Sequence, residues 1–132
     1  MENEKIKILI VDDDSFLLDM YALKFSQNNF EVYTAGNGVH ALEKLKGGLS
    51  PDILLIDIIM PEMDGFETLT QIKAQNLCSN CVKIILSNKS EQRDMDEGNK
   101  LGVVGYIVKA NFTPAEVIQQ VVKILEQKNH GL

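Results

Sequence analysis

Polar side chains that could take part in catalysis stand where apolar runs of this sequence end. They are Asp12, Asp13, Asp14, Asp57, Ser87 and Lys109. If the runs are parallel strands, their carboxyl ends meet at one edge of a sheet, where functional groups gather in open α/β folds. The sequence therefore predicts a cluster of three or four carboxylates, one hydroxyl and one ammonium.

Asp57 is the member least easily explained as an ordinary surface residue. It lies between the apolar segments 53–56 and 58–60, and a buried carboxylate is costly unless its charge is compensated. Two carboxylates about 5 Å apart repel each other by roughly 3 kcal/mol at an effective dielectric constant of about 20. Such a cluster favours a divalent cation with oxygen ligands, Mg²⁺ or alternatively Mn²⁺.

The predicted cluster suits phosphoryl transfer to a carboxylate. Mg²⁺ is commonly completed by phosphate oxygens, and a carboxylate beside it can attack phosphorus to give an aspartyl phosphate. Catalysis then consists mostly of positioning and of neutralising charge on three equatorial oxygens. The metal, the Lys109 ammonium and the Ser87 hydroxyl could each take one of these oxygens.

The elements that must position these residues follow an alternating pattern. Five short apolar runs, each followed by a helix-compatible stretch, predict parallel strands that are joined by right-handed crossover helices. The runs are 6–11, 30–35, 53–56, 82–86 and 103–108. We therefore predict an α/β domain with a (βα)5 order and a five-stranded parallel sheet.

Helix starts are well marked in most of the intervening stretches. The predicted N-terminal caps are Asp14 or Ser15, Asn37, Asp64 and Thr113. The first helix is expected to bury Leu17, Met20, Tyr21 and Phe25 on one face. The stretch 91–101 offers little besides Met95 and Leu101 for burial, and Gly98 weakens it by about 1 kcal/mol relative to alanine. We expect this fourth helix to be the least firmly attached.

Length and charge limit the classes of protein that fit. The chain has 132 residues, 13 Lys+Arg and 19 Asp+Glu, so its formal net charge is 13 − 19 = −6. This predicts one domain over 1–132, with a core of about 5–127 and polar termini. An acidic chain argues against direct nucleic-acid binding, and no apolar run is long enough for a membrane span. With no signal-peptide pattern at 1–7, we expect a cytoplasmic protein.

The two cysteines form a lone C-x-x-C, Cys78 and Cys81, just before a predicted strand. A structural zinc site normally needs four ligands, and a thioredoxin-type pair belongs after a strand, at a helix start. Reduced thiols without a specific role are the preferred interpretation, and a redox pair is the alternative.

Taken together, these motifs resemble the receiver domain of bacterial two-component response regulators, of the chemotaxis-regulator type. The segments that carry the resemblance are Val11–Ser15, Asp57 with Met60–Gly65, Ser87, and Gly102 through Tyr106 to Lys109. The resemblance covers about 5–127. It implies a doubly wound, flavodoxin-like sheet with strand order 2-1-3-4-5.

The resemblance also implies a role for each acidic residue. Asp57 would be the phosphoacceptor, charged by a sensor histidine kinase or a histidine phosphotransfer protein. Asp13, Asp57 and the backbone carbonyl of Ile59 would bind Mg²⁺ directly, and Asp12 would act largely through a water molecule. The domain would catalyse only its own phosphorylation and dephosphorylation, so it would not be an enzyme in the usual sense.

The same resemblance implies a switch. Lys109 would pair with the phosphoryl oxygens, Ser87 would follow the phosphoryl group, and Tyr106 would swing inward with it. The fourth helix, fifth strand and fifth helix would then present a changed face to a downstream protein.

Two positions depart from the family pattern. Ala110 stands where the family usually has proline after a cis bond, and a non-proline cis bond costs roughly 3 kcal/mol. Either Lys109–Ala110 is cis, or the loop is built differently and holds Lys109 less tightly. Ile59 is bulky, and its side chain would shield the phosphoryl group from water.

Three alternatives remain at this point. A haloacid-dehalogenase-type phosphatase would use Asp12 as nucleophile and Asp14 as acid, which leaves Asp57 unexplained. A receiver-like interaction module would bind partners without accepting phosphate. A flavodoxin-like cofactor module would need a Ser/Thr/Gly-rich phosphate loop where Asp12–Asp14 stand.

Overall fold

Five parallel strands form one sheet in the order β2-β1-β3-β4-β5. The computed structural model describes residues 4–130. The strands are β1 (Ile6–Val11), β2 (Phe30–Ala35), β3 (Ile53–Ile56), β4 (Val82–Ser87) and β5 (Val103–Val108). The helices are α1 (Ser15–Gln27), α2 (Gly38–Lys46), α3 (Gly65–Ala74), α4 (Gln92–Lys100) and α5 (Pro114–His130), with a 3₁₀ turn, η1 (Lys109–Asn111). The predicted fold class and strand order are confirmed, and β4 ends one residue later than predicted, at Ser87.

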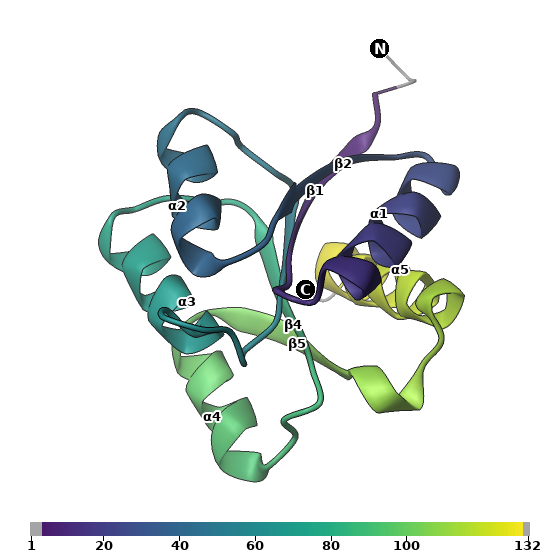
Figure 1. Ribbon diagram of the computed structural model, residues 1–132. Coiled ribbons are helices and arrows are strands. Elements are labelled where there is room, and N and C mark those ends of the chain that lie inside the picture. Colours follow the sequence, from purple (N-terminus) through teal and green to yellow (C-terminus); the bar gives the residue numbers. More distant parts are fainter. Residues whose placement is uncertain (1–3, 131–132) are drawn as a thin grey trace.

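Helices cover both faces of the sheet (Figure 1). Helices α1 and α5 lie together on one face, and α2, α3 and α4 lie on the other. Side chains of a strand alternate between the faces, so Ile8 and Ile10 enter the first core whereas Leu9 and Val11 enter the second. Both faces are therefore apolar, which explains the nearly unbroken apolar runs in the sequence.

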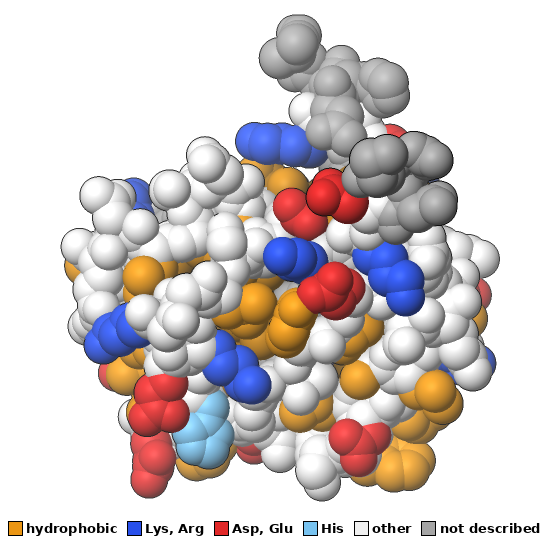
Figure 2. Space-filling view, turned by 90° about the horizontal axis from the view of Figure 1, so that it is seen from above, with side chains coloured by type: hydrophobic (Ala, Val, Ile, Leu, Met, Phe, Trp, Pro, Cys, Tyr) orange, Lys and Arg blue, Asp and Glu red, His pale blue; other side chains and the backbone are white. Residues whose placement is uncertain are grey.

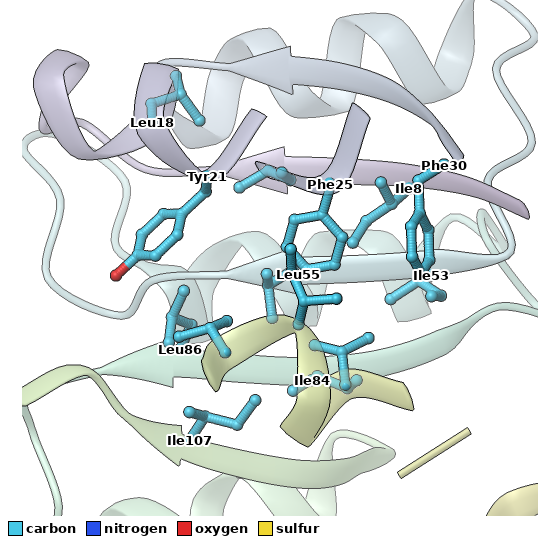
Figure 3. Packing of buried hydrophobic residues seen from close by; sticks show 14 residues of the cluster. Ile8, Leu18, Tyr21, Phe25, Phe30, Ile53, Leu55, Ile84, Leu86 and Ile107 are labelled. Atoms are coloured by element: carbon cyan, nitrogen blue, oxygen red, sulfur yellow. The ribbon is translucent and has the colours of Figure 1, made fainter. Parts of the chain in front are cut away.

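The first core is organised around aromatic rings from α1 (Figure 3). Phe25 is fully buried and meets Phe30 edge to face, with ring centroids 5.0 Å apart. The fully buried residues of α1 are Leu18, Tyr21 and Phe25, while Leu17 and Met20 are only partly covered. The prediction is thus confirmed for Tyr21 and Phe25, whereas it missed Leu18 and overstated the burial of Leu17 and Met20.

Local capping fixes where the helices begin. The Asp14 side chain accepts from the backbone N–H of Leu17 (3.1 Å), and Asn37 caps α2 in the same way. Asp64 and Glu67 form a reciprocal capping box at α3. Each of these caps was predicted, and each ends a loop that leaves the carboxyl edge of the sheet.

Helix α4 has an unusual buried side. Its two buried residues are Asp94 and Gly98, whereas Met95 is half-buried. A Cβ at Gly98 would lie 3.0 Å from the Ile85 side chain. The glycine therefore lets α4 approach the sheet closely, at the expense of helix propensity.

The surface carries charges of both signs. On the face in Figure 2, acidic and basic side chains lie next to one another, with hydrophobic side chains exposed between them. Within residues 4–130, no helix combines the length and apolar character that crossing a bilayer requires.

Candidate functional site

The predicted residues meet in a cavity at the carboxyl edge of the sheet. Its lining consists of Asp12, Asp13, Asp14, Leu17, Asp57, Ile59, Ser87, Asn88 and Lys109. Asp12, Asp13 and Asp57 each offer a carboxylate oxygen within 4.8 Å of the others. The structure thus brings together six predicted site residues from the ends of four strands, and places Tyr106 outside this cavity.

Asp57 is held in place by backbone groups on both sides. Its N–H donates to the carbonyl of Val11 (3.0 Å), which extends the β1–β3 pairing by one residue. Its Oδ1 accepts from the N–H groups of Ile58 (2.7 Å) and Ile59 (3.4 Å). With 7% of its surface exposed, Asp57 is buried but lines the cavity.

Gly65 explains how the loop after β3 keeps this shape. Its N–H donates to the carbonyl of Ile58 (2.7 Å). A Cβ at this position would lie 2.3 Å from the carbonyl oxygen of Asp57, so no larger residue fits. The tight fold of this loop places Ile59 at the cavity, with its side chain 59% exposed.

Lys109 bridges two of the carboxylates. Its Nζ lies 2.7 Å from Asp12 Oδ2 and 2.9 Å from Asp57 Oδ2. Burial alone lowers the pKa of Lys109, but the hydrogen bonds to Asp12 and Asp57 outweigh it, and the pKa is raised above its ordinary value. The side chain is therefore a fixed positive charge at neutral pH.

The acidic cluster carries more negative charge than Lys109 can neutralise. Burial raises the pKa of Asp12, against the opposing effects of Lys109 and of the Asp14 N–H, which donates to Asp12 Oδ1 (2.9 Å). When ionised, Asp12, Asp13 and Asp57 contribute −3 and Lys109 +1, which leaves −3 + 1 = −2. Three hard oxygen donors with an excess charge of −2 fit one divalent cation such as Mg²⁺.

Ser87 and Asn88 connect the end of β4 to the site. Ser87 is fully buried, and its Oγ accepts from the N–H of Lys89 (3.2 Å). Asn88 was not predicted to have a role. Its Oδ1 accepts from the N–H of Ala110 (2.7 Å), which joins the loops after β4 and β5. Its place directly after Ser87 at a strand end was the signal that could have identified it.

The Lys109–Ala110 bond is trans, because no cis bond occurs among residues 4–130. Of the two predicted outcomes, the second is therefore confirmed: the loop has no cis bond and forms the turn η1 instead. The expectation that Lys109 would then sit less tightly was wrong, because its ammonium contacts both carboxylates. An alanine also keeps the N–H that bonds to Asn88, which a proline would lack.

Tyr106 lies on the α4 side of β5. Its ring packs against the second core, and its hydroxyl donates to the backbone carbonyl of Lys89. Burial, followed by the charges of Asp94 and Asp57, raises the pKa of Tyr106 to about 12. Lys89 also forms an ion pair with the buried Asp94 (3.1 Å). Tyr106 and Lys89 thus connect β5 to the loop after β4.

The geometry argues against the phosphatase alternative. Asp14 would be its acid, but the Asp14 side chain caps α1. Asp12 would be its nucleophile, which leaves no role for the buried Asp57 that shares Lys109 with it. A cofactor phosphate is also disfavoured, because the cluster would repel it.

Comparisons with known proteins agree with this geometry. The model of the response regulator receiver domain matches residues 8–122. The chain is 32% identical over 121 residues to the alkaline phosphatase synthesis transcriptional regulatory protein PhoP of Bacillus subtilis, covering 92% of this chain and 49% of that protein. It is 34% identical to a CpxR homolog of Haemophilus influenzae, covering 92% of this chain and 51% of that protein. The chain thus spans about half the length of these relatives.

Solved structures give the same result. Chemotaxis protein CheY4 of Vibrio cholerae superposes with a TM-score of 0.84 at 26% identity, covering 92% of this chain and 99% of that one. A receiver domain of a Francisella response regulator has a TM-score of 0.80 at 31% identity, covering 94% and 99% of the two chains. The chain therefore belongs to the response regulator receiver domain family of two-component systems.

Proposed function

We propose that this receiver domain accepts a phosphoryl group on Asp57, in a reaction that depends on Mg²⁺. The observation that carries the proposal is the position of Lys109, which bridges Asp57 and Asp12 beside the uncompensated charge of Asp13. A site built only for stability has no need of a third carboxylate at this point, because it adds repulsion that the lysine does not neutralise.

Each residue of the cavity has one task in this reaction. A carboxylate oxygen of Asp57 attacks phosphorus as the bond to the donor, a phosphohistidine nitrogen, breaks. The Lys109 ammonium neutralises a phosphoryl oxygen, and the Ser87 hydroxyl donates to another. Asp13, Asp57 and the carbonyl of Ile59, with Asp12 through a water molecule, would hold Mg²⁺, which supplies the remaining charge neutralisation. The Ile59 side chain at the cavity limits the access of water to the product.

Phosphorylation changes the charge at Asp57 from −1 to about −2 and adds acceptor oxygens. Ser87 and Lys109 are drawn toward these oxygens. The residues that follow them, Asn88 and Ala110, are hydrogen-bonded to each other, so the two loops move together. Because Tyr106 is bonded to the backbone of Lys89, movement of this loop changes the contact between β5 and α4. The result is a shift between two packings of the α4/β5/α5 face, which a downstream protein reads.

The donor in the cell is, on this proposal, a sensor histidine kinase or a histidine phosphotransfer protein, and the reaction takes place in the cytoplasm. The two free thiols fit a reducing compartment. The only chemistry assigned to the domain is its own phosphorylation and dephosphorylation. The net charge of −6 argues against direct contact with nucleic acid by this domain.

Incubation with acetyl phosphate tests the proposal, with the intact mass as the readout. With Mg²⁺, the wild type should gain the mass of one phosphoryl group, and it should gain none when EDTA replaces Mg²⁺. Asp57→Asn should stay unlabelled, whereas Asp52→Asn, an exposed aspartate before β3, should be labelled like the wild type. A wild type that stays unlabelled by acetyl phosphate, phosphoramidate and a phosphorylated histidine kinase would support the phosphate-independent module instead.

A further inference from the structure

Cys78 and Cys81 lie in the loop between α3 and β4, which the phosphorylation chemistry does not use. Because this loop precedes β4, it lies at the edge of the sheet opposite the Asp57 cavity. Both thiols are free and partly exposed. We propose that Cys78 and Cys81 form a reversible intramolecular disulfide, a second modification site that makes this loop sensitive to thiol redox conditions.

The backbone already brings the two residues together. The N–H of Cys81 donates to the carbonyl of Cys78 (3.2 Å), so the cysteines occupy the first and last positions of a four-residue turn. The ends of such a turn lie within about 7 Å of each other, and disulfides bridge Cα atoms about 4.4–6.8 Å apart. A bond between the two thiols therefore requires little movement of the chain.

The turn is fixed at its first residue. Lys83 on β4 donates from its Nζ to the carbonyl of Cys78 (2.9 Å). Cys78 has a φ of +54°, in the left-handed region that a residue with a side chain rarely adopts. Leu77 is anchored to α3 through its N–H and the carbonyl of Ile72 (2.9 Å). The loop thus holds the cysteine pair in one arrangement.

The two cysteines have different environments, which gives them different roles. The hydrogen bond from Cys78, followed by the charge of Lys83, outweighs burial and lowers the pKa of Cys81. The same hydrogen bond, together with burial, raises the pKa of Cys78. The thiolate is the attacking species in disulfide exchange. Cys81 is therefore the attacking residue and Cys78 the resolving one.

The oxidant is a small-molecule disulfide of the glutathione class. The Cys81 thiolate attacks one sulfur of the oxidised glutathione, which forms a mixed disulfide and releases one glutathione thiolate. The proton of Cys78 passes to a released thiolate. The Cys78 sulfur then attacks the Cys81 sulfur, which forms the Cys78–Cys81 bond and releases the second glutathione. Two protein thiols are oxidised and one disulfide is reduced to two thiols.

A metal site is less consistent with the same residues. Within the part of the chain that the structure describes, the one group of three or more metal-ligating side chains is Asp12, Asp13 and Asp57, far from this loop. A structural zinc site needs further ligands beyond two thiolates. The ammonium of Lys83 beside the thiols also disfavours a cation.

Thiol trapping tests the proposal on the intact protein. After treatment with oxidised glutathione and alkylation, the wild type should carry no alkyl label and should form no disulfide-linked dimer. Dithiothreitol should restore two labels. The Cys78→Ser variant should instead stop as a glutathione adduct at Cys81, and Cys81→Ser should form an adduct several-fold more slowly. Two alkyl labels after oxidation, disulfide-linked dimers, or zinc bound to the purified protein would each overturn the proposal.

Lys83 provides a test of the electrostatic part. In the Cys78→Ser background, Lys83→Met should shift the pH profile of Cys81 alkylation to higher pH, whereas Lys123→Met, on the exposed side of α5, should leave it unchanged. Circular dichroism checks that each variant is folded. An unchanged profile in Lys83→Met would contradict the assigned role of the lysine. Labelling of Asp57 by acetyl phosphate is measured in parallel, so a failed disulfide is distinguished from a failed phosphorylation site.

Discussion

At the scale of single residues, the site is a balance between one buried ammonium and the carboxylates around it. Only about a tenth of the Lys109 side chain is exposed, and the Asp12 and Asp57 side chains that it bridges are buried as well. Removing one partner from such a group leaves an uncompensated buried charge, which costs far more than an exposed ion pair contributes.

Replacing Lys109 by methionine should therefore destabilise the protein as well as stop phosphorylation. We expect a loss of about 3–5 kcal/mol in the free energy of unfolding, measured by urea denaturation in EDTA. Adding Asp12→Asn to this variant should recover part of the loss. Lys44→Met, at an exposed position of α2, is the control and should change stability little. A loss below about 0.5 kcal/mol for Lys109→Met would show that the pairs are solvated.

Asp12 should make stability depend on pH. Burial raises its pKa in the folded protein above the ordinary value of 3.8, so the folded state binds the proton more tightly than the unfolded state. Protonated Asp12 contributes favourably to the free energy of unfolding below about pH 3.8, and this contribution is lost as the pH rises through the pKa of Asp12 in the folded protein. In EDTA, the difference in unfolding free energy between Asp12→Asn and the wild type should therefore shift in favour of the variant as the pH rises from about 4 to about 8. Urea unfolding of both proteins at the two pH values measures this difference, and a difference that does not change with pH would contradict the prediction.

The sequence allowed most site residues to be predicted, because strand ends are encoded locally. An apolar run that stops at Asp57 or Ser87 indicates both the strand and its functional end. The Asn88–Ala110 bond and the bond from the Tyr106 hydroxyl to Lys89 could not be predicted, because they depend on how segments about twenty residues apart meet in space.

At the scale of elements, α4 differs from the other helices in what it buries. It places a carboxylate, Asp94, and a glycine against the sheet, and the carboxylate is matched by Lys89 from the loop before it. The sequence indicated the shortage of apolar residues in this stretch. It did not indicate the buried Asp94, because an aspartate in a polar helix is normally exposed.

Hydrogen exchange should show that α4 opens more readily than α1. Because few apolar contacts hold α4, its amides should exchange faster than those of α1. Addition of acetyl phosphate and Mg²⁺ should change protection across residues 87–110 and leave α2 as it is. Asp57→Asn serves as the control and should show no change. Unchanged protection across 87–110 in a phosphorylated wild type would contradict the proposed switch.

At the scale of the whole molecule, the acidic site lowers the stability that the two apolar cores provide. The sheet brings three carboxylates to one point. Their mutual repulsion destabilises the protein when no cation is bound, and binding of a cation removes this repulsion. The parallel sheet with crossover helices could be predicted from the five apolar runs, whereas the strand order came from the resemblance to receiver domains.

Added Mg²⁺ should therefore raise the melting temperature. A cation at ten times its dissociation constant adds about 1.4 kcal/mol, or about 5 °C for a domain of this size. Asp13→Asn should raise the melting temperature slightly without Mg²⁺ and remove most of the Mg²⁺ response. Asp19→Asn, exposed on α1, should keep that response. Differential scanning calorimetry measures both, and an equal Mg²⁺ response in Asp13→Asn would contradict the assigned ligand.

The most direct test of the central claim is to locate the phosphoryl group on the chain. Borohydride reduces an aspartyl phosphate to homoserine, so peptide mass spectrometry after phosphorylation identifies the modified position. We expect homoserine at residue 57 alone, and only when Mg²⁺ was present. Homoserine at residue 12, or its absence from every aspartate of a protein that accepted phosphate, would contradict the claim.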